Sequence, residues 1–135
     1  MEKIIWDEGF SVGVPEMDRQ HRQIIYLINS LIEKQYIAVD SEIISDTLAR
    51  MLEYANEHFR REEQYMLESG YPDFSKQREE HNEFRKRTAF FSIDTIRHKT
   101  TIPKEVLAHL KEWWVNHILN TDMKYKAFFI ERGVR

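Results

Sequence analysis

The sequence contains no cysteine, little glycine and proline, and no long apolar run. The absence of cysteine excludes disulfides, thiolate metal sites and thiol catalysis, so any metal ligands must be histidine, carboxylate or amide side chains. No apolar stretch approaches the length that spans a bilayer, and the N-terminus MEKIIWDEGF lacks the charged-then-apolar pattern of a secretory signal. We therefore expect a cytoplasmic protein with no membrane partner.

Charge is not concentrated in any one part of the chain. The formal net charge is -3, the isoelectric point is near 6.1, and the basic residues are scattered among acidic ones. Proteins that bind nucleic acid usually carry a concentrated basic face, so we expect no nucleic-acid partner. A chain of 135 residues is long enough for one real core and short for two, so residues 1–135 are expected to form a single domain.

Four glycines and three prolines divide the chain into an N-terminal arm and four long helical segments. The arm covers residues 1–15 and carries Trp6 and Phe10 as expected anchors onto the core. The helices are expected at 16–38, from 41 to 69, from 74 or 75 to between 97 and 100, and from 103 to 121 or beyond.

Local signals mark the ends of these helices. Asp40 or Ser41 is expected to cap the second helix at its N-terminus, and Gly70 to end it. A short helical tail should precede Gly133. Because connections this short favour antiparallel neighbours, the sequence predicts an all-α, up-down-up-down four-helix bundle with an extended arm and a C-terminal tail.

Core-facing positions recur at alternating steps of four and three residues in each helical segment, which is the seam of a bundle. In each segment this seam includes at least one polar or metal-capable side chain among apolar neighbours. Those side chains are His21, His58, Glu62, Gln77, His81 and His117. In an antiparallel hairpin, residues equidistant from the turn lie at the same depth. By that rule we expect all six side chains to meet in one layer near one end of the bundle.

A layer of buried imidazoles around a buried carboxylate is costly unless it is paired or holds a metal ion. Any one of these histidines taken alone is explained by an ordinary hydrogen bond, but their coincidence at one depth favours a metal site. Imidazole and carboxylate donors without sulfur suit iron, manganese or zinc. Glu63 is expected to be partly exposed and to reach solvent. His98 and His109 fall outside the layer and are expected at the surface.

Asp122 is harder to place from spacing alone. It follows His117 by five residues, which on a straight α-helix corresponds to a rotation of about 140°. The two side chains then either lie on opposite sides of the inward edge, or a wider local turn brings them together.

Five stretches of the chain resemble the bacterial hemerythrins, which are non-haem di-iron, oxygen-binding four-helix bundles. They are SVGVPEMDRQH at 11–21, HFRREEQYM at 58–66, GYPDF at 70–74, HNEF at 81–84 and WWVNHILNTDMKY at 113–125. Each stretch alone is weak, but together they are highly specific. The likeness extends from Trp6 to Tyr125.

The resemblance assigns a role to each member of the layer and implies two iron ions, ferrous or ferric, joined by an oxo or hydroxo bridge. The implied ligands are His21 and His58 on the iron with an open position, His81 and His117 on the other, and Glu62 and Asp122 bridging both. It also implies a dry pocket, for which we expect walls from Ile24, Ile25, Trp114 and Ile118.

Gln77 stands where the family has a third histidine on the second iron. Its amide oxygen is a weaker donor toward iron than imidazole. Three outcomes are open: Gln77 ligates through oxygen, water takes the position, or Glu80 replaces it. The change could also admit peroxide or nitric oxide to both irons.

The resemblance implies an oxygen carrier, store or sensor. We therefore expect a binding protein and not an enzyme. The alternative is a di-iron peroxidase, oxidase or nitric-oxide-reactive protein, and a metal-free interaction bundle is a third class. Dioxygen is the expected partner of an expected monomer, and any protein acceptor or signalling partner cannot be named from the residues.

Overall fold

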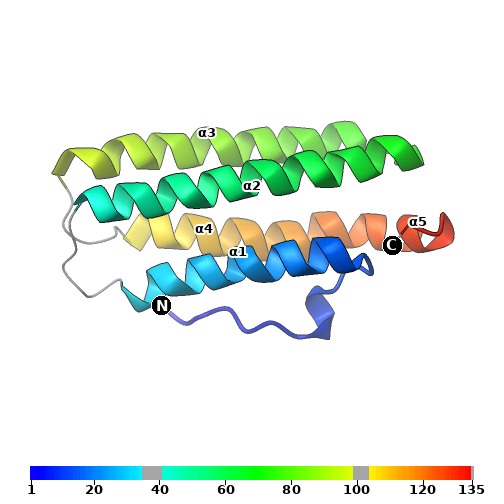
Figure 1. Ribbon diagram of the computed structural model, residues 1–135, viewed down its shortest axis with the longest axis horizontal. Helices are drawn as coiled ribbons and strands as arrows, with labels where there is room; N and C mark the ends of the chain where they lie inside the picture. Colours follow the sequence, from blue (N-terminus) through cyan, green and yellow to red (C-terminus); the bar gives the residue numbers. More distant parts are fainter. Residues whose placement is uncertain (35–40, 99–103, 135) are drawn as a thin grey trace.

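The computed structural model describes residues 1–34, 41–98 and 104–134, and all regular structure in these ranges is helical. The elements are the 3-10 turn η1 (Glu8–Phe10), α1 (Pro15–Glu33), α2 (Ser41–Ser69), α3 (Phe74–His98), α4 (Lys104–Asn116), the π-helical turn η2 (His117–Asp122) and α5 (Met123–Glu131). Each of the four long helices packs against two others, in the cyclic order α1, α2, α3, α4. Figure 1 shows them side by side, which confirms the predicted all-α four-helix bundle.

The helix ends agree closely with the predicted ones. Pro15 occupies the first turn of α1, where its missing N–H costs nothing. Gly70 ends α2 in the left-handed region at φ 73°, and the Tyr71 N–H donates to the Met66 carbonyl at 2.9 Å, which satisfies the last turn. The first helix is shorter than predicted: α1 ends at Glu33, where the Lys34 N–H donates to the Leu31 carbonyl at 3.1 Å, instead of at 38. The predicted capping role of Asp40 lies outside the described residues.

The N-terminal arm runs along the bundle beside α1 (Figure 1). The Asn29 side chain on α1 donates to the Ile4 carbonyl and accepts from the Ile4 N–H, both at 2.8 Å. Phe10 is buried and stacks on Trp6 with ring centroids 5.5 Å apart. Phe10 belongs to the larger apolar core cluster and Trp6 packs against it, which confirms both expected anchors. The turn η1 itself packs against the π-helical turn η2.

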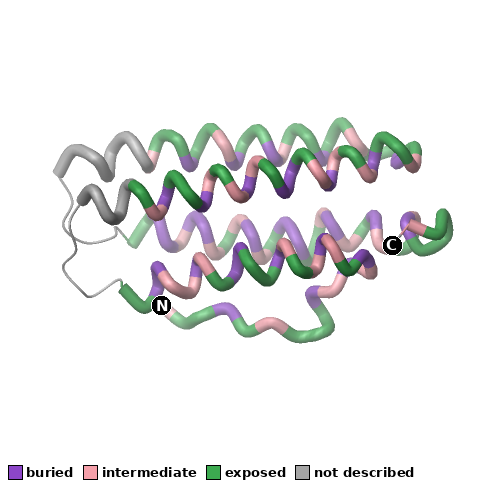
Figure 2. Tube along the Cα trace, in the orientation of Figure 1, coloured by how far each residue is buried: buried purple, intermediate pink, exposed green. Residues whose placement is uncertain are grey.

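Buried positions face the inside of the bundle along every helix (Figure 2). The apolar ones form two clusters, one that includes Phe59, Phe84 and Trp114, and a smaller one that includes Met17 and Tyr125. The predicted polar layer falls between these clusters along the helices, so apolar side chains close it off on both sides. Within the described ranges, no helix is both long and apolar enough to cross a membrane.

Candidate metal centre

Seven side chains singled out by the sequence are buried in the bundle, and none has more than 3% of its surface exposed. The chain supplies them as His21 from α1, His58 and Glu62 from α2, Gln77 and His81 from α3, and His117 and Asp122 from η2. The Nε2 atoms of His21 and His58 are 3.1 Å apart. This contact joins the first half of α1 to the second half of α2, as the predicted layer requires.

Glu62 lies between two pairs of histidines. Its Oε2 atom is 3.6 Å from the Nε2 of His21 and 3.4 Å from the Nε2 of His58. Its Oε1 atom is 3.1 Å from the Nε2 of His81. One carboxylate thus presents a different oxygen to each side of the layer.

Asp122 has the same arrangement. Its Oδ2 atom is 3.3 Å from the Nε2 of His21, and its Oδ1 atom is 3.0 Å from the Nε2 of His117. The π-helical turn brings His117 and Asp122 onto one face, because about 4.4 residues per turn places positions five apart only about 50° from each other around the axis, against about 140° on an α-helix. Of the two arrangements that the sequence left open, the structure has the wider turn.

Three of the four histidines donate a hydrogen bond from Nδ1, the ring nitrogen that faces away from the layer. The Nδ1–H of His58 donates to Gln20 Oε1 at 2.7 Å, that of His81 to Glu63 Oε2 at 2.9 Å, and that of His117 to Glu80 Oε1 at 3.1 Å. With Nδ1 donating to these partners, Nε2 is the nitrogen whose lone pair is left for a cation when the ring is neutral, and all three Nε2 atoms face the layer.

Sequence reasoning missed these three acceptors. Glu63 was expected to be partly exposed, and 16% of its side chain is exposed, but the sequence did not show that it reaches across from α2 to His81 on α3. The available signal was the general need of a ligating imidazole for an outer partner. Applied to the spacing of the bundle, it would have directed attention to acidic and amide side chains next to the seam.

Tyr125 is a further functional residue that the spacing did not reveal. Its buried phenol donates to Glu62 Oε2 at 2.8 Å. Burial and the negative charges of Glu62 and Asp122 raise the pKa of the phenol well above its ordinary value. Tyr125 is therefore a neutral donor that holds one of the two shared carboxylates in place.

The charges of the layer compensate one another. Burial alone would lower the pKa of His21, but the adjacent carboxylates of Asp122 and Glu62 outweigh it and raise the pKa to about 9. In the same way Asp122 and Glu80 raise the pKa of His117 to about 10 against its burial. Without a metal ion, protons on these two imidazoles therefore neutralise the buried carboxylates.

The buried atoms that lack a hydrogen bond show whether the residues fit a metal ion. In the described part of the chain, six of the seven unpartnered buried side-chain atoms belong to candidate ligands. These six are His21 Nδ1, Glu62 Oε1, Gln77 Oε1, His81 Nε2, His117 Nε2 and Asp122 Oδ2, and the seventh is Trp114 Nε1. Buried polar atoms are seldom left unpaired, and cations held by these donors would satisfy most of them.

Two sets of potential ligand atoms each lie within 4.8 Å of one another. One set is His21, His58 and Glu62, and the other is Glu62, His81 and His117. The shared Glu62 makes the centre suitable for two adjacent cations. Chemically, the arrangement offers imidazole nitrogen and carboxylate oxygen from side chains that are almost fully buried.

Comparison with known proteins agrees with this geometry. Residues 12–129 match the Hemerythrin HHE cation binding domain. The chain belongs to the hemerythrin family. It is 31% identical over 123 residues to a myohemerythrin of Theromyzon tessulatum, covering 90% of each chain. It is 29% identical over 125 residues to a bacteriohemerythrin of Stenotrophomonas maltophilia, covering 93% of this chain and 80% of the relative.

Solved hemerythrin structures have the same fold. A wild-type hemerythrin crystal structure superposes with a TM-score of 0.84 at 24% identity, covering 93% of this chain and 97% of the other. The crystal structure of a leucine-to-alanine mutant of hemerythrin gives a TM-score of 0.85 at 25% identity, with 94% of this chain and 97% of the other covered.

The four predicted wall residues of the pocket are all buried. Ile24, Trp114 and Ile118 have no exposed surface, and Ile25 has 4%. All four belong to the larger apolar cluster that borders the layer. They can therefore exclude water from the centre.

His109 corrects another expectation from the sequence. It was expected at the surface, but it is 6% exposed, with its Nε2 3.2 Å from Thr88 Oγ1 and its ring stacked on Phe84 at 5.5 Å. Burial and the nearby Arg87 charge lower its pKa to about 4, so the imidazole is neutral. It is a core residue away from the centre. The side chain of His98 lies outside the described part of the structure.

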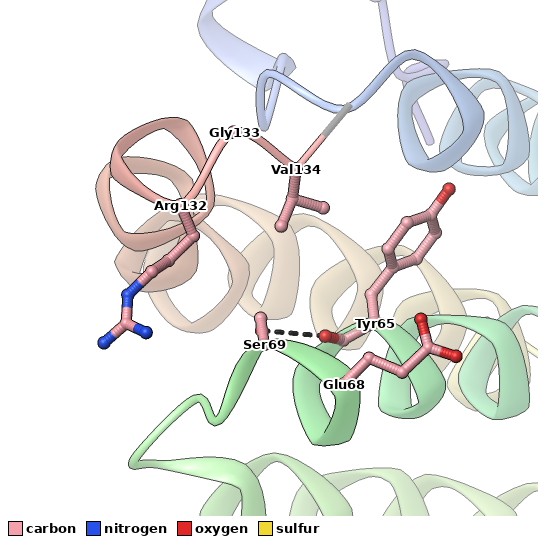
Figure 3. A pocket seen from close by; sticks show the side chains of 6 residues that line it. All are labelled: Tyr65, Glu68, Ser69, Arg132, Gly133 and Val134. Carbon is pink, nitrogen blue, oxygen red and sulfur yellow. Dashed lines mark hydrogen bonds between the residues drawn. The ribbon is translucent and has the colours of Figure 1, made fainter.

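A surface hollow of about 460 Å³ lies at the C-terminal end of the bundle (Figure 3). It is lined by Tyr65, Glu68, Ser69, Arg132, Gly133 and Val134. Ser69 Oγ donates to the Tyr65 carbonyl at 2.8 Å, and none of the seven candidate ligands lines the hollow. Among the described residues, the groups of histidine and carboxylate side chains that could hold a metal ion lie inside the bundle and not at this hollow.

Proposed function

We propose that the protein binds two iron ions in this centre and binds dioxygen there reversibly. One observation carries the proposal: two fully buried carboxylates, Glu62 and Asp122, each present one oxygen to His21 and the other to the His81–His117 side. A carboxylate held in this way is suited to bridge two cations. Membership of a cation-binding family, with bacteriohemerythrins and a myohemerythrin among the relatives, supports the proposal.

The donor set supports iron in particular. Imidazole and carboxylate side chains without sulfur suit iron, and helix bundles are recurrent hosts of carboxylate-bridged pairs of metal ions. The proposed ligands are His21 and His58 on one side, His81 and His117 on the other, and Glu62 and Asp122 shared. Two ferrous ions would supply the electrons that dioxygen takes up on binding and returns on release.

The protein's own contribution is to orient the donors and keep water out. Gln20, Glu63 and Glu80 hold three imidazoles with Nε2 inward, and Tyr125 fixes Glu62. The buried apolar wall keeps water out of the centre. Without water, the attraction between the bound cations and the carboxylates is stronger, and the cations are released to solvent less readily.

The two sides of the centre differ in the number of donors. The side with His21 and His58 has two imidazoles beside the shared carboxylates, whereas the side with His81 and His117 also has Gln77 nearby. The side with fewer donors has room for an added ligand. We therefore propose that dioxygen binds at the His21–His58 side.

Anaerobic loading of the metal-free protein with ferrous ion, followed by admission and removal of oxygen, tests this function. We expect a visible absorption band that forms with oxygen and disappears when it is removed. His58→Ala should abolish the band, whereas His109→Gln, which changes a buried histidine outside the centre, should keep it. Irreversible conversion to a ferric product, or no reaction of the two-iron protein with oxygen, would contradict reversible binding.

A further inference from the structure

The side-chain amide of Gln77 is held in one orientation. Gln77 lies on α3 and is 1% exposed. Its Nε2 atom donates to Asp122 Oδ1 at 3.1 Å and to the Thr121 carbonyl at 3.3 Å. Both partners are acceptors only, so a rotated amide would place its oxygen against two other oxygens. The amide nitrogen must therefore face Asp122 and Thr121.

This orientation leaves the amide oxygen buried and without a hydrogen-bond partner. The oxygen shares a small planar group with Nε2, so it lies close to Asp122 Oδ1. That carboxylate oxygen is also the one that is 3.0 Å from His117 Nε2. Burying an amide oxygen without a partner is costly, and a cation next to His117 would remove the cost.

Glu80 is not available to take this place. Its Oε1 atom accepts from His117 Nδ1 at 3.1 Å and from Thr121 Oγ1 at 2.9 Å. Turning the carboxylate inward would break both hydrogen bonds and release the His117 ring. Of the alternatives raised by the sequence, the observed contacts favour the glutamine oxygen.

We propose that Gln77 binds the cation on the His81–His117 side through Oε1, and that this oxygen shifts the side toward harder cations. The inference rests on the proposed metal-binding function and goes beyond it in assigning the donor atom and its effect on selectivity. An amide oxygen is a hard, neutral donor, whereas an imidazole favours later and softer first-row ions such as zinc. The metal site formed by Gln77, His81 and His117 should therefore discriminate less between manganese and zinc than a site with three imidazoles would.

Competition titrations with Mn²⁺ and Zn²⁺ on the metal-free protein test the inference without measuring any reaction of the loaded centre. In Gln77→Leu, which removes the donor, one of two cations should bind about tenfold more weakly or worse. In Gln77→His, the preference for Zn²⁺ over Mn²⁺ on that side should rise by about tenfold. Gln23→Leu and Gln23→His make the same changes at an exposed position and should leave both quantities unchanged.

The outcomes separate this inference from the proposed function. A wild-type protein that binds no cation would overturn both. Two cations bound by the wild type and bound equally well by Gln77→Leu would overturn the inference and leave the proposed function standing. If Gln77→Leu does not fold, Gln77→His decides: unchanged selectivity between the two metals overturns the inference, and the predicted rise supports it.

Discussion

Glu80 shows how a residue outside the seam controls one inside it. Its carboxylate receives the Nδ1–H of His117, so its charge keeps the ring oriented and makes Nε2 a better donor. We expect Glu80→Gln to weaken cation binding by about tenfold, because outer partners of ligating histidines typically have effects of that size. Glu79→Gln removes the same charge at an exposed neighbouring position and is the matched control. Equal affinities of the two variants in a chelator competition would show that Glu80 has no such role.

His109 should make the fold sensitive to acid. The pKa of His109 is about 4 in the folded chain against an ordinary 6.5. Between these two pH values the imidazole is protonated in the unfolded chain and neutral in the folded chain. Stability from this residue is therefore full above about pH 6.5 and is lost as the pH falls toward 4. In urea unfolding of the metal-free protein, the free energy of unfolding of His109→Gln should rise by about 1 to 3 kcal/mol relative to that of the wild type as the pH falls over that range. Parallel stability curves for the two proteins would refute this role.

At the level of single residues, the sequence predicted which side chains meet and missed what orients them. His21, His58 and His81 were identified because seam spacing and distance from a turn fix their depth. The acceptors of His58 and His81, Gln20 and Glu63, lie beside the seam, where spacing alone does not show whether a long side chain turns to solvent or to the next helix.

The N-terminal arm is an element whose attachment can be tested separately from the centre. Asn29 forms two hydrogen bonds with the backbone of Ile4, at net contributions of about 0.5–1.5 kcal/mol each. Asn29→Ala should therefore destabilise the fold by about 1 to 3 kcal/mol and speed hydrogen exchange at the Ile4 amide. Gln23→Ala, an exposed change on the same helix, should stay within about 0.5 kcal/mol. Unchanged exchange at Ile4 would mean that the arm is held by its apolar contacts alone.

Elements were predicted well where local signals are strong. Gly70 ends α2 as expected because a left-handed residue and the following Tyr71 satisfy the last carbonyls. The π-helical turn could not be predicted in the same way, since no residue type specifies it. The spacing of Asp122 from His117 showed only that a straight α-helix would turn the two side chains away from each other. In the structure, η1 packs against η2 where the turn is wider.

For the whole molecule, metal binding and stability are linked. The apolar clusters lie on either side of a layer whose charges are balanced by protons when no cation is bound. A cation that binds only the folded chain adds RT ln(1 + [L]/Kd), about 4 kcal/mol at a thousandfold excess over Kd. We expect chelation to lower Tm and re-addition of ferrous ion to restore it. A Tm that does not respond to the metal would contradict a centre buried in the core.

The single domain over 1–135, the cytoplasmic location and the monomeric state stay predictions.

An anaerobic titration of the metal-free protein with ferrous ion, counted per chain, tests the central claim most directly. Two shared carboxylates between two pairs of histidines predict saturation at two ions per chain, and at fewer than two in Glu62→Leu. Saturation of the wild type at one ion, or no binding at all, would contradict a centre built to hold a pair.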